Sequence, residues 1–391
     1  MASNALSRTV SGIGQKVFAG NIYNTSELAG AFGDLGTLIP FAIGYIVVNK
    51  IDPVGILVSL GILKIFVGLY FKTPVPIQPM KAIGAAAISN PGTITQGMVW
   101  GSGLFSAVIW MLMAVTGAIS LLSKITAKPV IRGIMLGLGF SFIIEGLKMM
   151  NGQWLIAVIA MAVTFLLLAS KRLPAMIVLL GLGVVASLIL NPGVLGELKQ
   201  ISIQFRLPSL VFGKVTWSDI LLGSLILGIP QVPLTLGNAV LGTVAENNEL
   251  FPNHPITVKK VALDHGLINI VSFVLSGMPV CHGAGGMAGH VRFGAKTGGA
   301  LVMLGVILLV LGLFFSQSVA LLFNMIPSAI LGVILFFAGL ELSSMIRDIG
   351  TEKADIYVLL VTAGIGVINI GIAFVAGLAL YYALKIKWVK V

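Results

Sequence analysis

Two stretches of the chain combine helix-breaking residues with groups that could bind an anion. In the first, Pro74, Pro76 and Pro79 precede Lys81 and a run of small residues that extends to Ile88. Prolines at this spacing favour an extended backbone, and Pro79 suits the first turn of a helix because its missing N–H needs no partner there. A short helix starting near Pro79 would present free N–H groups and a positive dipole end, which together attract anions.

Gln78 lies at the mouth of this predicted short helix, where its amide can donate a hydrogen bond. The first candidate substrate segment is therefore Gln78, Pro79, Met80 and Lys81. The alternative interpretation is a proline-rich loop at the membrane surface with no ligand. Against it, non-helical backbone at membrane depth is tolerated only where protein or a water-lined cavity satisfies its polar groups.

The second stretch is the glycine-rich segment 277–299. Glycine allows a ligand to approach main-chain N–H groups closely. His282 could donate to an oxyanion or carry a coupled proton, and Gly283 and Ala284 follow it. The alternative is that these glycines serve only close helix packing. A nucleotide-binding P-loop is not predicted, because its Lys-Ser/Thr pair is absent.

Asp34 lies within the first apolar run, and an ionisable residue inside a membrane span is a functional candidate by default. Beside a doubly charged anion, a carboxylate suits proton coupling better than direct contact. The alternative is a structural ion pair with Lys64 or Lys81. Gly36 and Thr37 follow in the sequence and could offer an N–H and a hydroxyl to the substrate.

A further set of polar side chains, Gln231, Thr235 and Asn238, lies in a proline-interrupted apolar run. Their spacing places them on one helix face, where they bind substrate or act only in helix packing. Asp264 and His265 form a gate or a buried pair. The 4 histidines and 1 cysteine are well separated, so no metal site, cofactor or catalytic grouping is predicted and the chain is not expected to be an enzyme.

The composition requires a lipid environment for these groups. The chain has 391 residues, of which 57% are hydrophobic and 9% charged, whereas soluble domains carry about 25% charged residues. Its mean hydropathy is +1.06. A net charge of +11 would suggest nucleic acid for a soluble protein. Here the charges lie between apolar runs, so no nucleic-acid partner is predicted.

The predicted fold is an all-α polytopic membrane protein with fourteen transmembrane segments. Spanning helices need about 20 apolar residues, and twelve runs qualify. The short segments 77–89 and 281–290 are interpreted as half-helices that meet at the midplane. The twelve spans are 28–48, 53–71, 97–121, 129–149, 152–169, 174–190, 219–244, 256–277, 298–316, 318–341, 355–371 and 373–388.

Charge placement favours the fourteen crossings. With the N-terminus in the cytoplasm, seventeen lysines and arginines fall in inside segments, five in outside segments and two within segments. This bias follows the positive-inside rule, and omitting the two half-helices would spoil it. We therefore expect a multi-pass protein of the plasma membrane with both termini cytoplasmic.

The order of features repeats along the chain. Residues 1–195 would form a first repeat of spans 1–7 and residues 215–391 a second repeat of spans 8–14. Segment 277–282 holds the place that 75–80 holds in the first half. Seven crossings per repeat require the halves to be inverted, and inverted repeats with paired broken helices are typical of secondary transporters with a midplane site.

Three motifs resemble the molybdate transporter branch of the sulfate permease (SulP) superfamily. They are NTSELAGAFGDLGTLIP at 24–40, PVPIQPMKAI at 74–83 and MPVCHGAGGMAG at 278–289. The resemblance implies the seven-plus-seven fold of uracil permeases, with a core of spans 1–4 and 8–11 (about 24–121 and 219–316). Spans 5–7 and 12–14 (about 127–190 and 318–388) would form the gate. The wider superfamily usually has a cytoplasmic regulatory (STAS) domain, which this chain and the molybdate branch are expected to lack.

The resemblance places the substrate among Gly36 and Thr37, Gln78 to Lys81, Gln231 to Asn238, and His282 to Ala284. It implies alternating-access transport of molybdate, or next sulfate, between the half-helix N-termini. Proton symport through Asp34 and His282 and a homodimer through the gate are further hypotheses. A nucleobase permease remains an alternative, although the half-helices lack the acid that would grip ring N–H groups. An anion channel is the other.

Overall fold

The computed structural model describes residues 16–119, 127–167, 175–190, 203–344, 346–368 and 370–388. The described chain is mostly helical, with two short antiparallel strand pairs. The strands β1 (Lys16–Phe18) and β2 (Asn21–Tyr23) form a hairpin before the first helix. The strands β3 (Gln78–Pro79) and β4 (Val280–Cys281) pair across the two halves of the chain.

The first span is bent rather than straight. The span begins with α1 (Thr25–Ala31) and a 3-10 turn (Phe32–Asp34), and it continues with α2 (Leu35–Ile43) and a π-helical turn (Gly44–Val48). The helix axis bends by 53° between these two parts. The remaining helices of the first half are α3 (Pro53–Phe71), α4 (Lys81–Ser89), α5 (Gln96–Thr116), α7 (Lys128–Met150), α8 (Trp154–Leu167) and α9 (Ala175–Leu190).

The second half opens with a long helical rod that two π-helical segments interrupt. It comprises α11 (Trp217–Leu222), a π-helical segment (Gly223–Gly228), α12 (Ile229–Leu234), a second π-helical segment (Thr235–Gly242) and α13 (Thr243–Leu250). The other helices are α14 (Val258–Val274), α15 (Ala284–Arg292), α16 (Gly299–Met325), α17 (Ser328–Ser344), α18 (Lys353–Ile368) and α19 (Ile370–Lys385).

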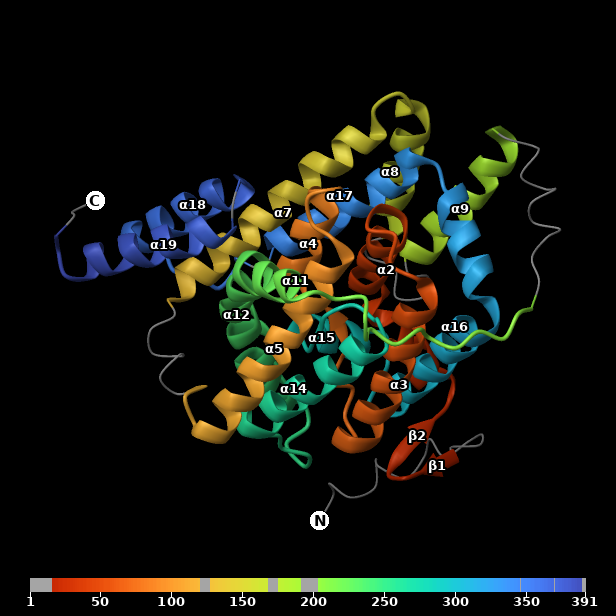
Figure 1. Ribbon diagram of the computed structural model, residues 1–391, viewed down its shortest axis with the longest axis horizontal. Helices are drawn as coiled ribbons and strands as arrows, with labels where there is room; N and C mark the ends of the chain where they lie inside the picture. The colour runs from red at the N-terminus through yellow and green to blue at the C-terminus, as the bar shows by residue number, and fades with distance from the viewer. Residues whose placement is uncertain are drawn as a thin grey trace, which may run out of the picture.

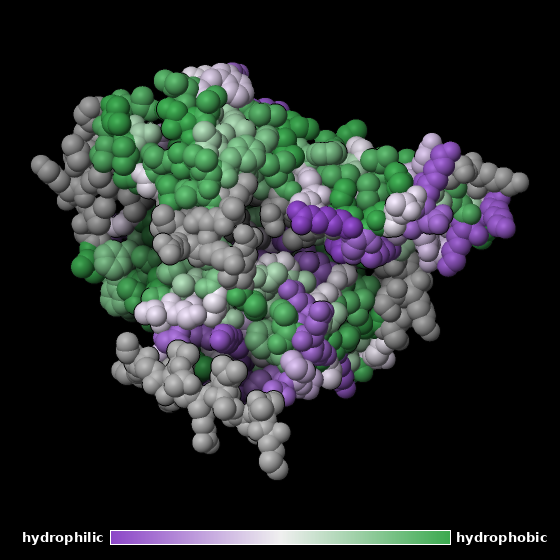
Figure 2. Space-filling view, turned by 180° about the vertical axis from the view of Figure 1, so that it is seen from behind, coloured by the Kyte–Doolittle hydropathy of each residue, from purple (hydrophilic) through white to green (hydrophobic). Residues whose placement is uncertain are grey.

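The described helices and their surface suit a bilayer. Five helices are long and apolar enough to cross one, or six if the bent first pair counts as one span; fourteen crossings therefore remain a prediction. Figure 2 shows a broad hydrophobic surface with hydrophilic side chains gathered in separate patches. On α8, Leu155 and Leu166 are 77% and 80% exposed. Lipid would cover such side chains, whereas water would not favour them.

The helices pack as pairs that join the two halves of the chain. Helix α7 packs most extensively against α17 and α18, α3 against α16, and α5 against α14. Figure 1 shows α7, α17, α18 and α19 along one side of the molecule, α3, α5 and α14 along the other, and α4 between them. The polar segments described below therefore lie between two groups of packed helices.

Two predicted boundaries are wrong. The sequence divided spans at 317, but α16 runs on to Met325 and α17 begins at Ser328, directly after Pro327. Ser316 and Ser318 are buried, which explains why these polar residues do not end the helix. The first half-helix begins at Lys81 rather than near Pro79, because Pro79 is paired in β3. The predicted ends at 121, 169 and 174 and the boundary at 195 lie outside the described residues.

Candidate substrate site

The β3–β4 ladder places the starts of two short helices together in the interior. Gln78 pairs with Cys281 and Pro79 with Val280, and the Met80 N–H donates to the Pro279 carbonyl at 3.0 Å. Strand β3 leads into α4, and β4 leads into α15 after two residues. The two half-helices that the sequence predicted therefore begin on either side of one hydrogen-bonded seam.

Side chains from neighbouring helices hold the extended backbone on both sides of this seam. The Lys64 ammonium on α3 donates to the Ile77 carbonyl at 2.8 Å. On α14, the Asn269 side chain donates to the Val280 carbonyl at 2.7 Å and accepts from its N–H at 3.0 Å. These contacts satisfy backbone groups that no helix ladder serves, as membrane-depth backbone requires.

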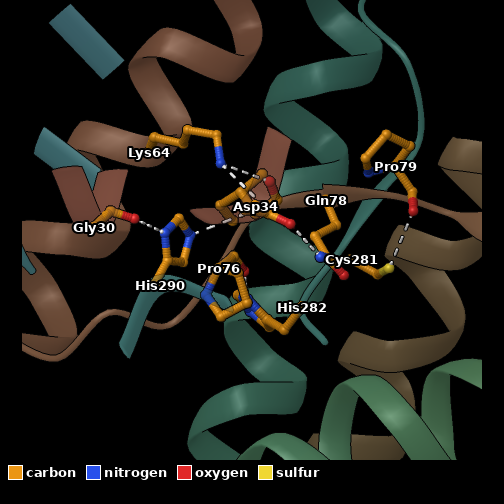
Figure 3. Close-up of polar contacts among 10 residues, drawn as sticks. Gly30, Asp34, Lys64, Pro76, Gln78, Pro79, Cys281, His282 and His290 are labelled. Carbon is orange, nitrogen blue, oxygen red and sulfur yellow. Dashed lines mark hydrogen bonds and ion pairs between the residues drawn. The ribbon is translucent and has the colours of Figure 1, made fainter. Parts of the chain in front are cut away.

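Asp34 is the centre of a buried polar cluster (Figure 3). Lys64 Nζ lies 3.6 Å from Asp34 Oδ2, and Gln78 Nε2 donates to Asp34 Oδ1. His290 Nε2 is 3.9 Å from Asp34 Oδ2, and its Nδ1 donates to the Gly30 carbonyl at 2.8 Å. Lys64 thus compensates the charge of Asp34, and the Asp34 carboxylate holds the Gln78 side chain in place. A structural ion pair with Lys64 was one of the alternatives that the sequence left open.

His282 belongs to a second buried cluster. Its Nδ1 lies 2.9 Å from the Pro76 carbonyl, to which it must donate, and its Nε2 lies 2.8 Å from Asp264 Oδ2. The His265 ring lies 6.1 Å from that of His282, measured between centroids. Both ring nitrogens of His282 therefore face protein groups.

A small cavity brings together three of the predicted site residues. Lys81, the first residue of α4, lines it together with Gln231 and Asn238 from the long rod and Cys281 from β4. Lys81 is only 5% exposed, so its positive charge is largely withdrawn from water. The remaining lining residues are Met135, Leu234 and Ala239.

Gln231 reaches from α12 to the start of α4. Its Oε1 accepts from the Ala82 N–H at 2.8 Å and from the Ile83 N–H at 3.4 Å. Its Nε2 donates to the Thr235 hydroxyl at 3.1 Å. The N–H groups at the start of α4 have no acceptor within the helix and need an oxygen from outside it. In this structure the side-chain carbonyl oxygen of Gln231 is that acceptor.

Gly283 brings the start of α15 against Gln78 and Asn238. A Cβ at Gly283 would lie 2.4 Å from Gln78 Oε1 and 3.1 Å from Asn238 Nδ2, so a larger residue there would have to displace the Gln78 side chain. The Oε1 atom of Gln78 is buried and has no hydrogen-bond partner among the described residues. Polar groups from both halves thus meet at this point.

The predicted residues fall into two groups. Those at the seam and the cavity come together: Gln78, Pro79, Met80, Lys81, Gln231, Thr235, Asn238, Gly283 and Ala284, the first residue of α15. Gly36 and Thr37 lie in the first turn of α2, and neither Thr37 nor His282 is among the described residues that line the cavity.

Sequence reasoning missed His290, Met135 and the pairing of His282 with Asp264. Met135 gave no signal, because it is one apolar residue among many. His282 and His290 are the two histidines of the glycine-rich segment. An ionisable side chain in such a segment could have indicated an acidic partner for each. No group of three or more metal-ligating side chains occurs within the described ranges.

Comparisons with known proteins identify the family of this chain. The family described as "Molybdate transporter of MFS superfamily" matches residues 26–142 and 223–342. Molybdate transporter 2 of Arabidopsis thaliana is 31% identical over 93% of this chain and 88% of its own length. Molybdate transporter 1 of Chlamydomonas reinhardtii is 27% identical over 90% of each chain.

Solved structures show the same fold at low sequence identity. The transmembrane domain of the cyanobacterium bicarbonate transporter BicA superposes with a TM-score of 0.66 at 17% identity, covering 90% of this chain and 97% of that one. The murine Solute Carrier 26 family member A9 anion transporter in the inward-facing state gives 0.66 at 14% identity, covering 94% and 69%.

These matches indicate a transporter rather than an enzyme. The two ranges matched by the family model include both segments that form the β3–β4 seam and the part of the long rod that carries Gln231. At 17% and 14% identity, the superposed structures show the fold alone. The protein is a member of the family described as "Molybdate transporter of MFS superfamily".

Proposed function

We propose that the protein is a secondary active transporter of a tetrahedral oxyanion, with molybdate as the first substrate and sulfate as the next. The observation that carries this proposal is the cavity at the start of α4. Lys81, Gln231 and Asn238 line it, and the start of α15 lies beside Gln78 and Asn238. The names of the curated relatives favour molybdate over sulfate.

The electrostatics of this site suit a dianion. Two helix N-termini contribute positive dipole ends, and Lys81 adds a full charge at 5% exposure. The nearest acid of the first half, Asp34, is compensated by Lys64. A nucleobase site would need an uncompensated carboxylate facing the cavity, and none of the cavity-lining residues is acidic.

Alternating access would follow from movement of one helix group against the other. In this proposal the core comprises residues 24–121 and 219–325, and the gate comprises 127–190 and 328–388, with the second boundary moved to the end of α16. The cavity is lined by core residues apart from Met135, which comes from α7 of the gate. Rocking of the core along α7 would then expose the site first to one side of the membrane and afterwards to the other.

Calorimetry on the purified protein tests the site. The wild type is expected to bind molybdate, and Gln78→Ala is expected to weaken binding at least tenfold, because hydrogen bonds to charged groups contribute about 1.5–3 kcal/mol. Gln78 also donates a hydrogen bond to Asp34 and lies close to Gly283, the residue before α15. Gln204→Ala is the control, since Gln204 is exposed. Absence of heat with folded wild type and either anion would refute the oxyanion proposal.

Proton coupling is assigned in this proposal to the His282–Asp264 pair, whose Nε2 and Oδ2 atoms lie 2.8 Å apart, rather than to Asp34. Uptake of molybdate into proteoliposomes is expected to rise when an inward proton gradient is imposed. Asp264→Asn should retain binding but lose this response, because an amide cannot exchange the proton. Wild-type uptake that ignores the gradient would contradict proton symport and leave the anion site in place.

A further inference from the structure

The side chain of Gln231 occupies a position that a substrate oxygen would need. This inference rests on the proposed function, because it concerns the same cavity. The Gln231 Oε1 atom receives both the Ala82 and the Ile83 N–H groups. Those two groups belong to the first turn of α4, where the anion is expected to bind.

Gln231 differs from an ordinary helix cap. A capping side chain normally comes from the residue that precedes the helix and reaches N–H groups two or three positions later. Met80 stands at that position in α4 and makes no side-chain cap. The acceptor comes instead from α12, about 150 residues further along the chain, and is 2% exposed.

The orientation of this amide is held by Thr235. The Gln231 Nε2 donates to the Thr235 hydroxyl, which turns the carbonyl oxygen toward α4. Gln231 and Thr235 lie one helical turn apart, where α12 passes into a π-helical segment. Such segments occur frequently at functional sites.

We infer that Gln231 is an internal stand-in for the anion, and that substrate binds by displacing its carbonyl oxygen from the start of α4. One oxygen fits between the two N–H groups, so the side chain and the substrate compete. The neutral carbonyl satisfies these N–H groups while the site is empty. An oxyanion replaces it because charge-assisted hydrogen bonds are about twice as strong as neutral ones.

Two substitutions at this position distinguish a competitor from a ligand. Gln231→Met keeps the length of the side chain but removes the carbonyl, so molybdate should bind about two- to tenfold more tightly, in line with one neutral hydrogen bond. Gln231→Glu places a carboxylate on the same N–H groups, so binding should weaken more than tenfold. Isothermal calorimetry with sodium molybdate, on monodisperse full-length protein in detergent, measures both.

The opposite signs are the critical result, because general structural damage would weaken binding in both variants. Thr235→Val provides a second measurement, since it frees the Gln231 amide from its hydroxyl partner; tighter binding is expected there too. Weaker binding in both Gln231→Met and Thr235→Val would overturn the inference and make Gln231 a direct ligand. Wild-type protein that binds no oxyanion would instead refute the proposed function itself.

Discussion

Replacing Lys64 with methionine is expected to destabilise the protein by about 3–5 kcal/mol, the usual cost of removing one partner from a buried ion pair. Lys64 and Asp34 are both fully buried at the side chain and lie 3.6 Å apart. Without the lysine, Asp34 keeps an uncompensated charge, and the Ile77 carbonyl loses its donor. Thermal unfolding in detergent should show a fall in melting temperature of more than about 5 °C.

A double variant tests the cause of this loss. Lys64→Met combined with Asp34→Asn removes both charges, while the asparagine can still accept from Gln78, so much of the lost stability should return. Lys128→Met is the matched control, because Lys128 and Asp348 form an ion pair whose side chains are 56% and 43% exposed, and exposed pairs contribute little. A single Lys64→Met variant as stable as the wild type would show that Asp34 does not need the lysine.

Gly289→Ala is expected to reduce molybdate uptake at least tenfold and to lower stability. Gly289 on α15 and Gly33 in the first span touch each other's backbone: a Cβ at Gly289 would lie 2.5 Å from the Gly33 carbonyl oxygen, and one at Gly33 would lie 2.3 Å from that of Gly289. Backbone cannot move aside as a side chain can, so α15 must shift. That shift would displace His290 from Asp34 and the start of α15 from Gln78.

Gly181→Ala serves as the control for this prediction. Gly181 lies within α9, and a Cβ there would meet no atom of the described residues within 4 Å. Alanine favours the helix by about 1 kcal/mol relative to glycine, so this variant should be as stable as the wild type or slightly more stable. Uptake by proteoliposomes and melting temperature are measured for both variants. Normal transport by Gly289→Ala would contradict the close approach.

The two half-helices could be predicted because proline and glycine act on the local backbone. Pro74, Pro76 and Pro79 favour extended structure whatever surrounds them, and that is the structure of β3 and the residues before it. The polarity of Gln231 and Asn238 inside an apolar run also marked them correctly as residues that face the protein interior. These signals depend on the local sequence, so they can be recognised without knowledge of the fold.

The partners of the buried charges could not be predicted from the sequence. Lys64 and Lys81 were equal candidates for Asp34, because only the bend of the first span and its approach to α3 decide between them. His282 and Asp264 lie on different elements, and no periodicity links them. The contact of Gln231 with Ala82 depends on how α12 crosses α4, which composition does not determine.

The position where α16 ends and the π-helical segments of the long rod could not be predicted from the sequence either. The polar run Ser316–Ser318 resembled a boundary, but its two serines are buried within α16. The segments Gly223–Gly228 and Thr235–Gly242 are π-helical, a winding that the sequence analysis did not predict. Both features depend on packing against neighbouring helices.

The pairing of Gln78 with Cys281 has a consequence for synthesis. The two residues are 203 positions apart in the chain (281 minus 78). At about 5–20 residues per second, a ribosome needs about 10–40 s to deliver the second strand after the first. During that interval the backbone around Gln78 has no ladder partner, and each unsatisfied group in lipid costs several kcal/mol. The nascent first half must therefore be sheltered by the insertion machinery until its counterpart emerges.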